Sequence, residues 1–104
     1  MRVVFTQAAD ADIISIFIYL QSRNPQAAAT IIRRVRDRCF SLAQHPRRGG
    51  LVGVRNGREL RRIVELPFVV FYAPTHDRIT IFRVLHGARD FQAILDEIFE
   101  SDPE

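Results

Sequence analysis

The chain has 104 residues, of which 47% are hydrophobic and 26% are charged. This is enough apolar material for one core and too little length for two, so we expect a single domain over residues 1–104. No run approaches the roughly 20 apolar residues of a membrane span, and the first residues turn polar too soon for a signal peptide, which favours a cytoplasmic protein. All 15 basic residues are arginine, and six of the 12 acids follow residue 89, so residues 1–89 carry a charge of +9. Such a charge attracts nucleic acid or an acidic protein.

The first part of the chain is predicted to form a strand and two helices. Apolar residues 3–5 predict a strand at about 2–6, and Thr6 is a good N-cap for a helix over about 8–22. Asn24 and Pro25 supply the cap and first-turn proline of a second helix, whose apolar residues recur at helical spacing until near Pro46. Because the link between the two helices is so short, we expect an antiparallel hairpin.

The second part of the chain changes to the period of strands. Residues 46–57 contain four glycines and little periodicity, which predicts a loop. Residues 60–66, 68–73 and 79–86 are β-branched and aromatic runs separated by short turn sequences, so they predict three antiparallel strands. Helical spacing from Phe91 to Phe99 predicts a short final helix that Asp90 can cap.

The run 79–86 is apolar on both sides. Strict alternation places Ile79, Ile81, Arg83 and Leu85 on one face and Thr80, Phe82, Val84 and His86 on the other. This pattern is typical of a central strand that is covered on two sides. The predicted class is therefore α+β, with an N-terminal strand, an antiparallel helical hairpin packed on a small antiparallel sheet and a short C-terminal helix.

Motifs for metal binding, cofactor binding or catalysis are weak in this sequence. The histidines, His45, His76 and His86, have no partner at metal-ligand spacing, so no metal site is expected. His86 could act as a general acid or base, although a histidine bonded to a nearby group is commoner. The glycines at 49–53 lack the following Lys-Ser or Lys-Thr of a phosphate loop, and no serine has a nucleophile elbow. We expect no cofactor and no catalytic residue.

Arginine clusters are the stronger feature. One lies on the polar side of the second helix, where a solvated face is the simpler interpretation. The other falls within 16 residues that contain one acid, Glu59, and creates a local positive field. A further arginine, Arg83, lies inside an apolar strand, so it must reach a carboxylate or a partner to avoid a desolvation cost. The clusters are Arg33, Arg34, Arg36 and Arg38, and Arg47, Arg48, Arg55, Arg58, Arg61 and Arg62.

Four stretches resemble the ParE branch of the ParE/RelE toxin superfamily, small bacterial toxins encoded beside an antitoxin. They are residues 4–14, residues 24–28, the loop from Pro46 through Gly49 and Gly50 to residues 57–60, and residues 84–90, which read Val-Leu-His-Gly-Ala-Arg-Asp. Together they span nearly the whole chain in the family's order. The predicted succession of elements is similar to the family's helical hairpin packed on a small antiparallel sheet.

The resemblance implies one of two activities. RelE-like members cut messenger RNA on the ribosome with Lys, Arg, Tyr, His or Glu side chains, whereas ParE-like members poison DNA gyrase without cleaving RNA. This sequence has no lysine, reads Phe68-Val69-Val70 where a catalytic arginine would sit, and has no Tyr or His after Arg89. The resemblance therefore implies a gyrase inhibitor neutralised by a ParD-like antitoxin, with DNA met only through gyrase or antitoxin. A ribosome-dependent endoribonuclease using Tyr72 and His86, and a non-toxic interaction module, are the alternatives.

Two sets of residues are candidates for contact with these partners. The wide apolar face of residues 13–20 and the two-sided strand 79–86 offer more hydrophobic surface than a small monomer hides, which suits an acidic antitoxin segment that folds on binding. Charge clustering selects the candidates for the target. The antitoxin candidates are Ile13, Phe17, Leu20, Arg33, Arg36 and Phe82, and the target candidates are Arg58, Arg61, Arg62, Arg83, His86 and Arg89.

Overall fold

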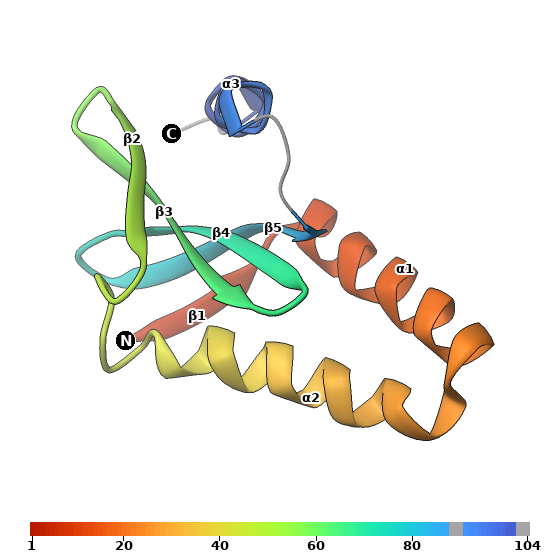
Figure 1. Cartoon of the computed structure of the whole chain (residues 1–104). Helices are drawn as coiled ribbons and strands as arrows, with labels where there is room; N and C mark the ends of the chain where they lie inside the picture. Colours follow the sequence, from red (N-terminus) through yellow and green to blue (C-terminus); the bar gives the residue numbers. More distant parts are fainter. Residues whose placement is uncertain (88–90, 102–104) are drawn as a thin grey trace.

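The computed structural model describes residues 1–87 and 91–101, and over these residues the chain forms a five-stranded sheet with helices on both faces (Figure 1). The strand order is β1-β5-β4-β3-β2, in which β1 runs parallel to β5 and the other neighbours are antiparallel. The α+β prediction is confirmed. The elements are β1 (Arg2–Phe5), α1 (Gln7–Arg23), α2 (Pro25–Ser41), β2 (Gly50–Arg55), β3 (Arg58–Glu65), β4 (Phe68–Pro74), β5 (Arg78–His86) and α3 (Phe91–Ser101).

The two helices of the hairpin begin where their caps predict. The Thr6 hydroxyl accepts a hydrogen bond from the backbone of Ala9, and the Asn24 side chain accepts one from Ala27. Helix α2 ends at Ser41, earlier than the predicted end near Pro46, because the next three amides bond to carbonyls three residues back and tighten the chain into turns. No helix that the structure describes is long and apolar enough to cross a membrane.

Strand β2 was not predicted, and the loop prediction is wrong for these residues. Gly50–Arg55 pairs with β3 as the edge of the sheet, with a register shift between Leu51 and Gly53. The hairpin turn is Asn56-Gly57, with φ of 53° and 76°. Positive φ at both central residues is the requirement of the tight hairpin turn that Asn-Gly favours.

Each face of the sheet carries a hydrophobic cluster, which confirms that the central strands are covered on both sides. On the helical-hairpin face the buried residues come from α1, the end of α2 and the inner strands. On the other face, α3 covers the sheet with Ile94, Leu95, Ile98 and Phe99. The hairpin-face cluster is Ala9, Ile13, Val35, Cys39, Leu42, Ile63, Phe68, Val70, Tyr72, Ile79, Ile81 and Val84; the α3-face cluster is Leu60, Val69, Phe71, Ala73, Phe82 and Ile98.

A β-bulge in β5 changes the predicted alternation of its side chains. Ile81 pairs with Tyr72 of β4 and Arg83 pairs with the adjacent Phe71, so Phe82 is an extra residue in the ladder. As a result Phe82 and Arg83 both lie toward α3, while Val84 joins Ile79 and Ile81 on the hairpin face. The predicted placement of Arg83 on the face of Ile79 and Ile81 is therefore wrong.

The cysteine is part of the core. Cys39 is buried and has no disulfide partner. Burial raises the pKa of its thiol to about 12, because the thiolate would lose its hydration. A thiol that stays neutral at physiological pH is a poor nucleophile, so Cys39 acts as a small apolar side chain.

Candidate functional site

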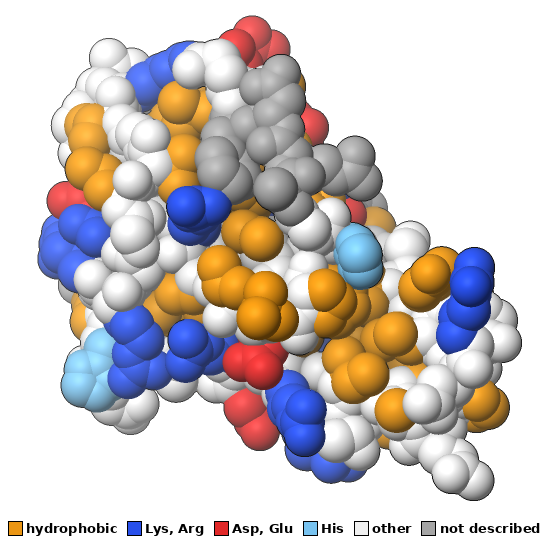
Figure 2. Space-filling model, in the orientation of Figure 1, with side chains coloured by type: hydrophobic (Ala, Val, Ile, Leu, Met, Phe, Trp, Pro, Cys, Tyr) orange, Lys and Arg blue, Asp and Glu red, His pale blue; other side chains and the backbone are white. Residues whose placement is uncertain are grey.

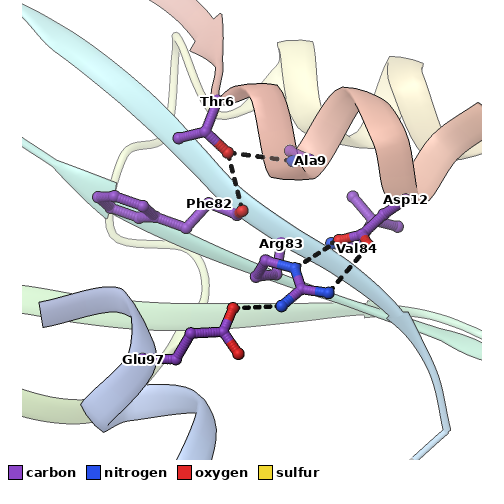
Figure 3. Close-up of polar contacts among 7 residues, drawn as sticks. All are labelled: Thr6, Ala9, Asp12, Phe82, Arg83, Val84 and Glu97. Carbon is purple, nitrogen blue, oxygen red and sulfur yellow. Dashed lines mark hydrogen bonds and ion pairs between the residues drawn. The ribbon is translucent and has the colours of Figure 1, made fainter. Parts of the chain in front are cut away.

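Arg83 joins the two layers that enclose the sheet, at the bulge of β5 (Figure 3). Its Nε and Nη2 donate to the two carboxylate oxygens of Asp12 on α1, at 2.7 and 3.0 Å, and its Nη1 donates to Glu97 on α3. The Asp12 and Arg83 side chains are only 15% and 21% exposed. The hydrogen bond to Asp12 raises the pKa of the guanidinium above its ordinary value. Of the two predicted alternatives for Arg83, the structure shows a group paired within the chain.

Thr6 and Asp12 also form hydrogen bonds with the backbone of β5 where β1 no longer pairs with it. The last residue of β5 that pairs with β1 is Ile81. Beyond it, the Thr6 hydroxyl donates to the Phe82 carbonyl at 2.9 Å, and the Asp12 carboxylate accepts the Val84 amide at 3.0 Å (Figure 3). These contacts pair backbone groups that a short edge strand would leave open, and they fix α1 to the sheet.

An open cleft of about 800 Å³ lies beside this network, between the start of α1, the β4–β5 turn and α3. Its walls include Arg58, Arg78 and Arg83, together with the acids Asp77 and Glu97. Hydrogen bonding from the Thr75 side chain lowers the pKa of Asp77, with the nearby Arg78 adding to the effect. The cleft is thus lined by charges of both signs, which suits binding of a charged partner surface.

A second polar cluster holds the loop that precedes β2. The Tyr72 hydroxyl accepts the Gly49 amide at 2.9 Å, and Arg61 Nη1 donates to the Gly49 carbonyl at 2.7 Å. Arg61 Nε also donates to Glu59 at 2.8 Å, which lowers the pKa of that carboxyl, and Arg47 contacts the same group at 3.3 Å. Tyr72 is fully buried, and its burial raises the pKa of the phenol. These contacts assign Tyr72 and Arg61 a structural role in the loop.

The structure does not bring Tyr72 and His86 together. His86 pairs with Phe68 at one end of β4, and its ring contacts the Phe68 ring edge-on at 5.5 Å. Tyr72 is four residues further along β4, which corresponds to about 13 Å of strand. The acid–base pair that the ribonuclease alternative would use is therefore not assembled.

The target candidates are spread over the sheet. Arg61 and Arg62 lie on opposite faces, because their partners in β4 are Tyr72 and Phe71, which belong to the two different clusters. Arg58 begins β3 beside the cleft, whereas His86 ends β5. Arg89 lies outside the described residues.

The apolar antitoxin candidates on α1 and β5 are buried or half-buried. Ile13 is 2% exposed, Phe17 and Leu20 are half-buried, and Phe82 is 8% exposed beneath α3. On α2, Arg33 is exposed and Arg36 lies over the ring of Phe5.

The apolar side chains of α1 that are exposed lie next to those predicted to contact the antitoxin. Ile14 and Ile18 are 60% and 61% exposed, and Tyr19 is 51% exposed. In the β3–β4 segment, Val64 and Leu66 are exposed as well. Hydrophobic side chains gather on the viewed face where this segment approaches the helical hairpin (Figure 2). The sequence predicted a wide apolar stripe on α1 but not which of its side chains are exposed. Ile14 and Ile18 are four residues apart and therefore neighbours on the helix surface, which was the one sequence signal for this exposed edge.

The comparisons with known proteins decide the family. The model of the ParE toxin of type II toxin-antitoxin systems, parDE, matches residues 3–91. The chain belongs to the ParE toxin family. Toxin RelE2 of Caulobacter vibrioides is 35% identical to this ParE-family chain over 88 residues, which are 85% of this chain and 97% of the relative. Putative toxin Y4kP of Sinorhizobium fredii is 26% identical over 94 residues, 90% of this chain and 96% of that protein.

A solved structure agrees with the fold of this ParE-family chain. It is described as the chromosomal ParDE TA system from P. aeruginosa, and it matches with a TM-score of 0.69 and 20% identity over 85% of this chain and 97% of that one. The match to the ParE toxin model over residues 3–91 confirms the sequence resemblance to the ParE branch, and the solved structure confirms the fold. The protein is a ParE-family toxin of a type II toxin-antitoxin system.

Proposed function

We propose that this ParE-family toxin acts in the cytoplasm by inhibiting DNA gyrase through surface contacts, without catalysing a reaction. The main support for the proposal is the structural role of Tyr72. Its buried hydroxyl accepts the Gly49 amide, and Tyr72 itself lies far from His86 along β4. General acid–base catalysis needs both groups within reach of one substrate. The name of the relative RelE2 keeps ribosome-dependent cleavage of messenger RNA as the second candidate.

Charge complementarity is the second support for a binding mechanism. Residues 1–89 carry a charge of +9, and Arg58 lies at a cleft open to solvent. A toxin that traps gyrase on cleaved DNA needs a shaped surface with charge opposite to its target. We propose Arg58 and Arg62 as target contacts, because both belong to the arginine cluster of residues 47–62 and Arg58 also lines the open cleft.

A supercoiling assay tests the proposal. We expect the purified toxin to block supercoiling by gyrase and to accumulate cleaved DNA, and we expect Tyr72→Phe and His86→Gln to retain this effect. Reversing Arg58 and Arg62 together to glutamate should reduce inhibition at least tenfold through like-charge repulsion. The double variant Arg2→Glu, Arg23→Glu changes the charge equally at two exposed positions and should inhibit like the wild type.

Two outcomes would overturn gyrase inhibition. One is ribosome-dependent cleavage of messenger RNA that is lost in Tyr72→Phe or His86→Gln while supercoiling is untouched, which would establish the ribonuclease. The other is unimpaired growth when the toxin is expressed alone, which would establish a non-toxic interaction module. Thermal unfolding of each variant shows whether lost inhibition reflects a lost surface or a lost fold.

We further propose that a ParD-like antitoxin covers the exposed apolar side of α1. Ile14, Ile18 and Tyr19 are exposed there, and the arginines of α2 lie on the neighbouring helix. An amphipathic acidic segment that folds on binding would match both the apolar and the cationic groups.

Co-purification with the product of the neighbouring antitoxin gene tests this partner. We expect Ile14→Asp with Ile18→Asp to weaken the complex at least 100-fold, because two carboxylates would be buried without partners. Leu51→Asp with Val54→Asp adds the same charge at exposed apolar positions of β2, outside the α1 surface, and should bind within about threefold of wild type. Equal loss in both double variants, or a wild-type toxin that never co-purifies, would contradict the proposed surface.

A further inference from the structure

Helix α2 carries arginines that no described acid neutralises. Among the described residues, no carboxylate lies within 4.0 Å of Arg33, Arg34 or Arg36. In contrast, several arginines of the sheet and its loops are paired with acids, among them Arg55 with Asp96 and Arg83 with Asp12 and Glu97. Three arginines without a carboxylate partner among the described residues therefore lie within four successive positions of α2.

The arginines of α2 occupy both flanks of its exposed surface. Successive helical residues are 100° apart, and α2 is anchored to the core by Val35 and Cys39. From this anchor, Arg33 and Arg36 fall on one flank and Arg34 and Arg38 on the other.

Arg38 has one acid nearby, and Arg48 lies beyond the end of α2 on the same flank as Arg38. The Nε of Arg38 lies 3.8 Å from Glu65, while Arg48 donates to the Ser41 hydroxyl at 3.1 Å. Basic side chains recur along the edge of the molecule that α2 forms, with acidic groups between them (Figure 2). The acid on α2 itself is Asp37, so residues 33–38 keep a net charge of +3.

We propose that α2 binds duplex DNA directly, with its arginines on the phosphate backbone. Like charges on neighbouring turns repel one another, and phosphates on both sides of the helix would remove that repulsion. The major groove, about 12 Å wide, admits an α-helix and presents phosphates along both rims. Guanidinium groups on both flanks of α2 suit this geometry.

An acidic protein fits this surface less well than DNA does. Binding of a protein helix needs apolar anchors beside the cations, and the exposed ring of α2, Phe40, is already in edge contact with Phe5 at 5.7 Å. The exposed apolar pair of the hairpin, Ile14 and Ile18, lies on α1. The apolar part of the surface proposed for the antitoxin is therefore on α1, and the arginines of α2 border it.

Fluorescence anisotropy of a labelled 20-base-pair duplex with the purified toxin tests the proposal without gyrase. We expect Arg33→Gln with Arg34→Gln to weaken binding about tenfold at low salt and to reduce the slope of log K against log salt by about 1.8, for two lost phosphate contacts. Arg2→Gln with Arg23→Gln removes the same charge from exposed positions outside α2 and should change affinity less than twofold.

Three results would overturn the proposal. An equal loss in the two double variants would mean general attraction by net charge, and competition by poly-glutamate as strong as by DNA would mean an acidic-protein surface. Absence of wild-type binding at low salt would also exclude it. The binding assay contains no gyrase. A toxin that does not bind the duplex could therefore still inhibit gyrase, and a toxin that does not inhibit gyrase could still bind DNA through α2.

Discussion

Replacing Asp12 by alanine is expected to lower the free energy of unfolding by about 3 kcal/mol, because it removes one partner of a largely buried ion pair. Asp12 binds both Nε and Nη2 of Arg83 and accepts the Val84 amide. The alanine variant would leave the guanidinium with Glu97 alone and the amide without a partner. Urea unfolding at pH 7, followed by circular dichroism, measures the change.

Two further variants separate the roles of Asp12. Asp10→Ala removes a carboxylate from the exposed first turn of the same helix and should cost about 0.5 kcal/mol, through the helix dipole alone. Asp12→Asn keeps an oxygen that can accept the Val84 amide and loses the charge, so its cost should lie between the two alanine variants. A cost for Asp12→Ala as small as that for Asp10→Ala would show that the Arg83 network does not stabilise the fold.

Local signals in the sequence were sufficient for most of the elements. Thr6 and Asn24 cap the helices as predicted because a cap is a contact between residues three apart, which any window of the sequence contains. Strand β2 was missed because its glycines were interpreted as loop residues. The Asn56-Gly57 pair beside it was the signal of a hairpin turn, so this element was within reach of the sequence.

The bulge in β5 is a different case, because its cause lies far away in the sequence. Phe82 is extruded where Thr6 bonds its carbonyl and Asp12 bonds the Val84 amide, and these contacts join residues more than 70 positions apart. The predicted alternation of side chains between the two faces of β5 is therefore wrong after Ile81. The need for a partner of Arg83 followed from desolvation, but the identity of that partner required the fold.

The residues exposed on the interaction surfaces likewise depended on contacts between distant parts of the sequence. The stripe on α1 was predicted to present Ile13, which is 2% exposed, while the adjacent Ile14 is 60% exposed. One residue corresponds to 100° on a helix, and the packing of α1 against β5 decides which edge of a wide stripe faces the core. Likewise, arginine clusters in the sequence did not show that Arg61 is held by Glu59 and Gly49.

Replacing Gly49 by alanine is expected to cost about 3 kcal/mol of stability, at the upper end of overpacking effects. A Cβ at this position would lie within 3.0 Å of the Arg62 carbonyl oxygen and of the Tyr72 ring and hydroxyl. The carbonyl cannot retreat easily, since Arg62 pairs with Gly50 on one side and Phe71 on the other. Tyr72 cannot retreat either, because it is fully buried in the hairpin-face cluster.

Gly50→Ala is the matched control for this prediction, because a Cβ on the adjacent residue meets nothing within 4 Å. We expect its midpoint of thermal unfolding to stay within about 3 °C of wild type, against a fall of at least about 12 °C for Gly49→Ala. Combining Gly49→Ala with Tyr72→Phe should not restore stability, since the clash with the Arg62 carbonyl would persist and the Gly49 amide would lose its acceptor. Equal midpoints for the two alanine variants would mean that the loop before β2 is not held against the sheet by Tyr72 and Arg61.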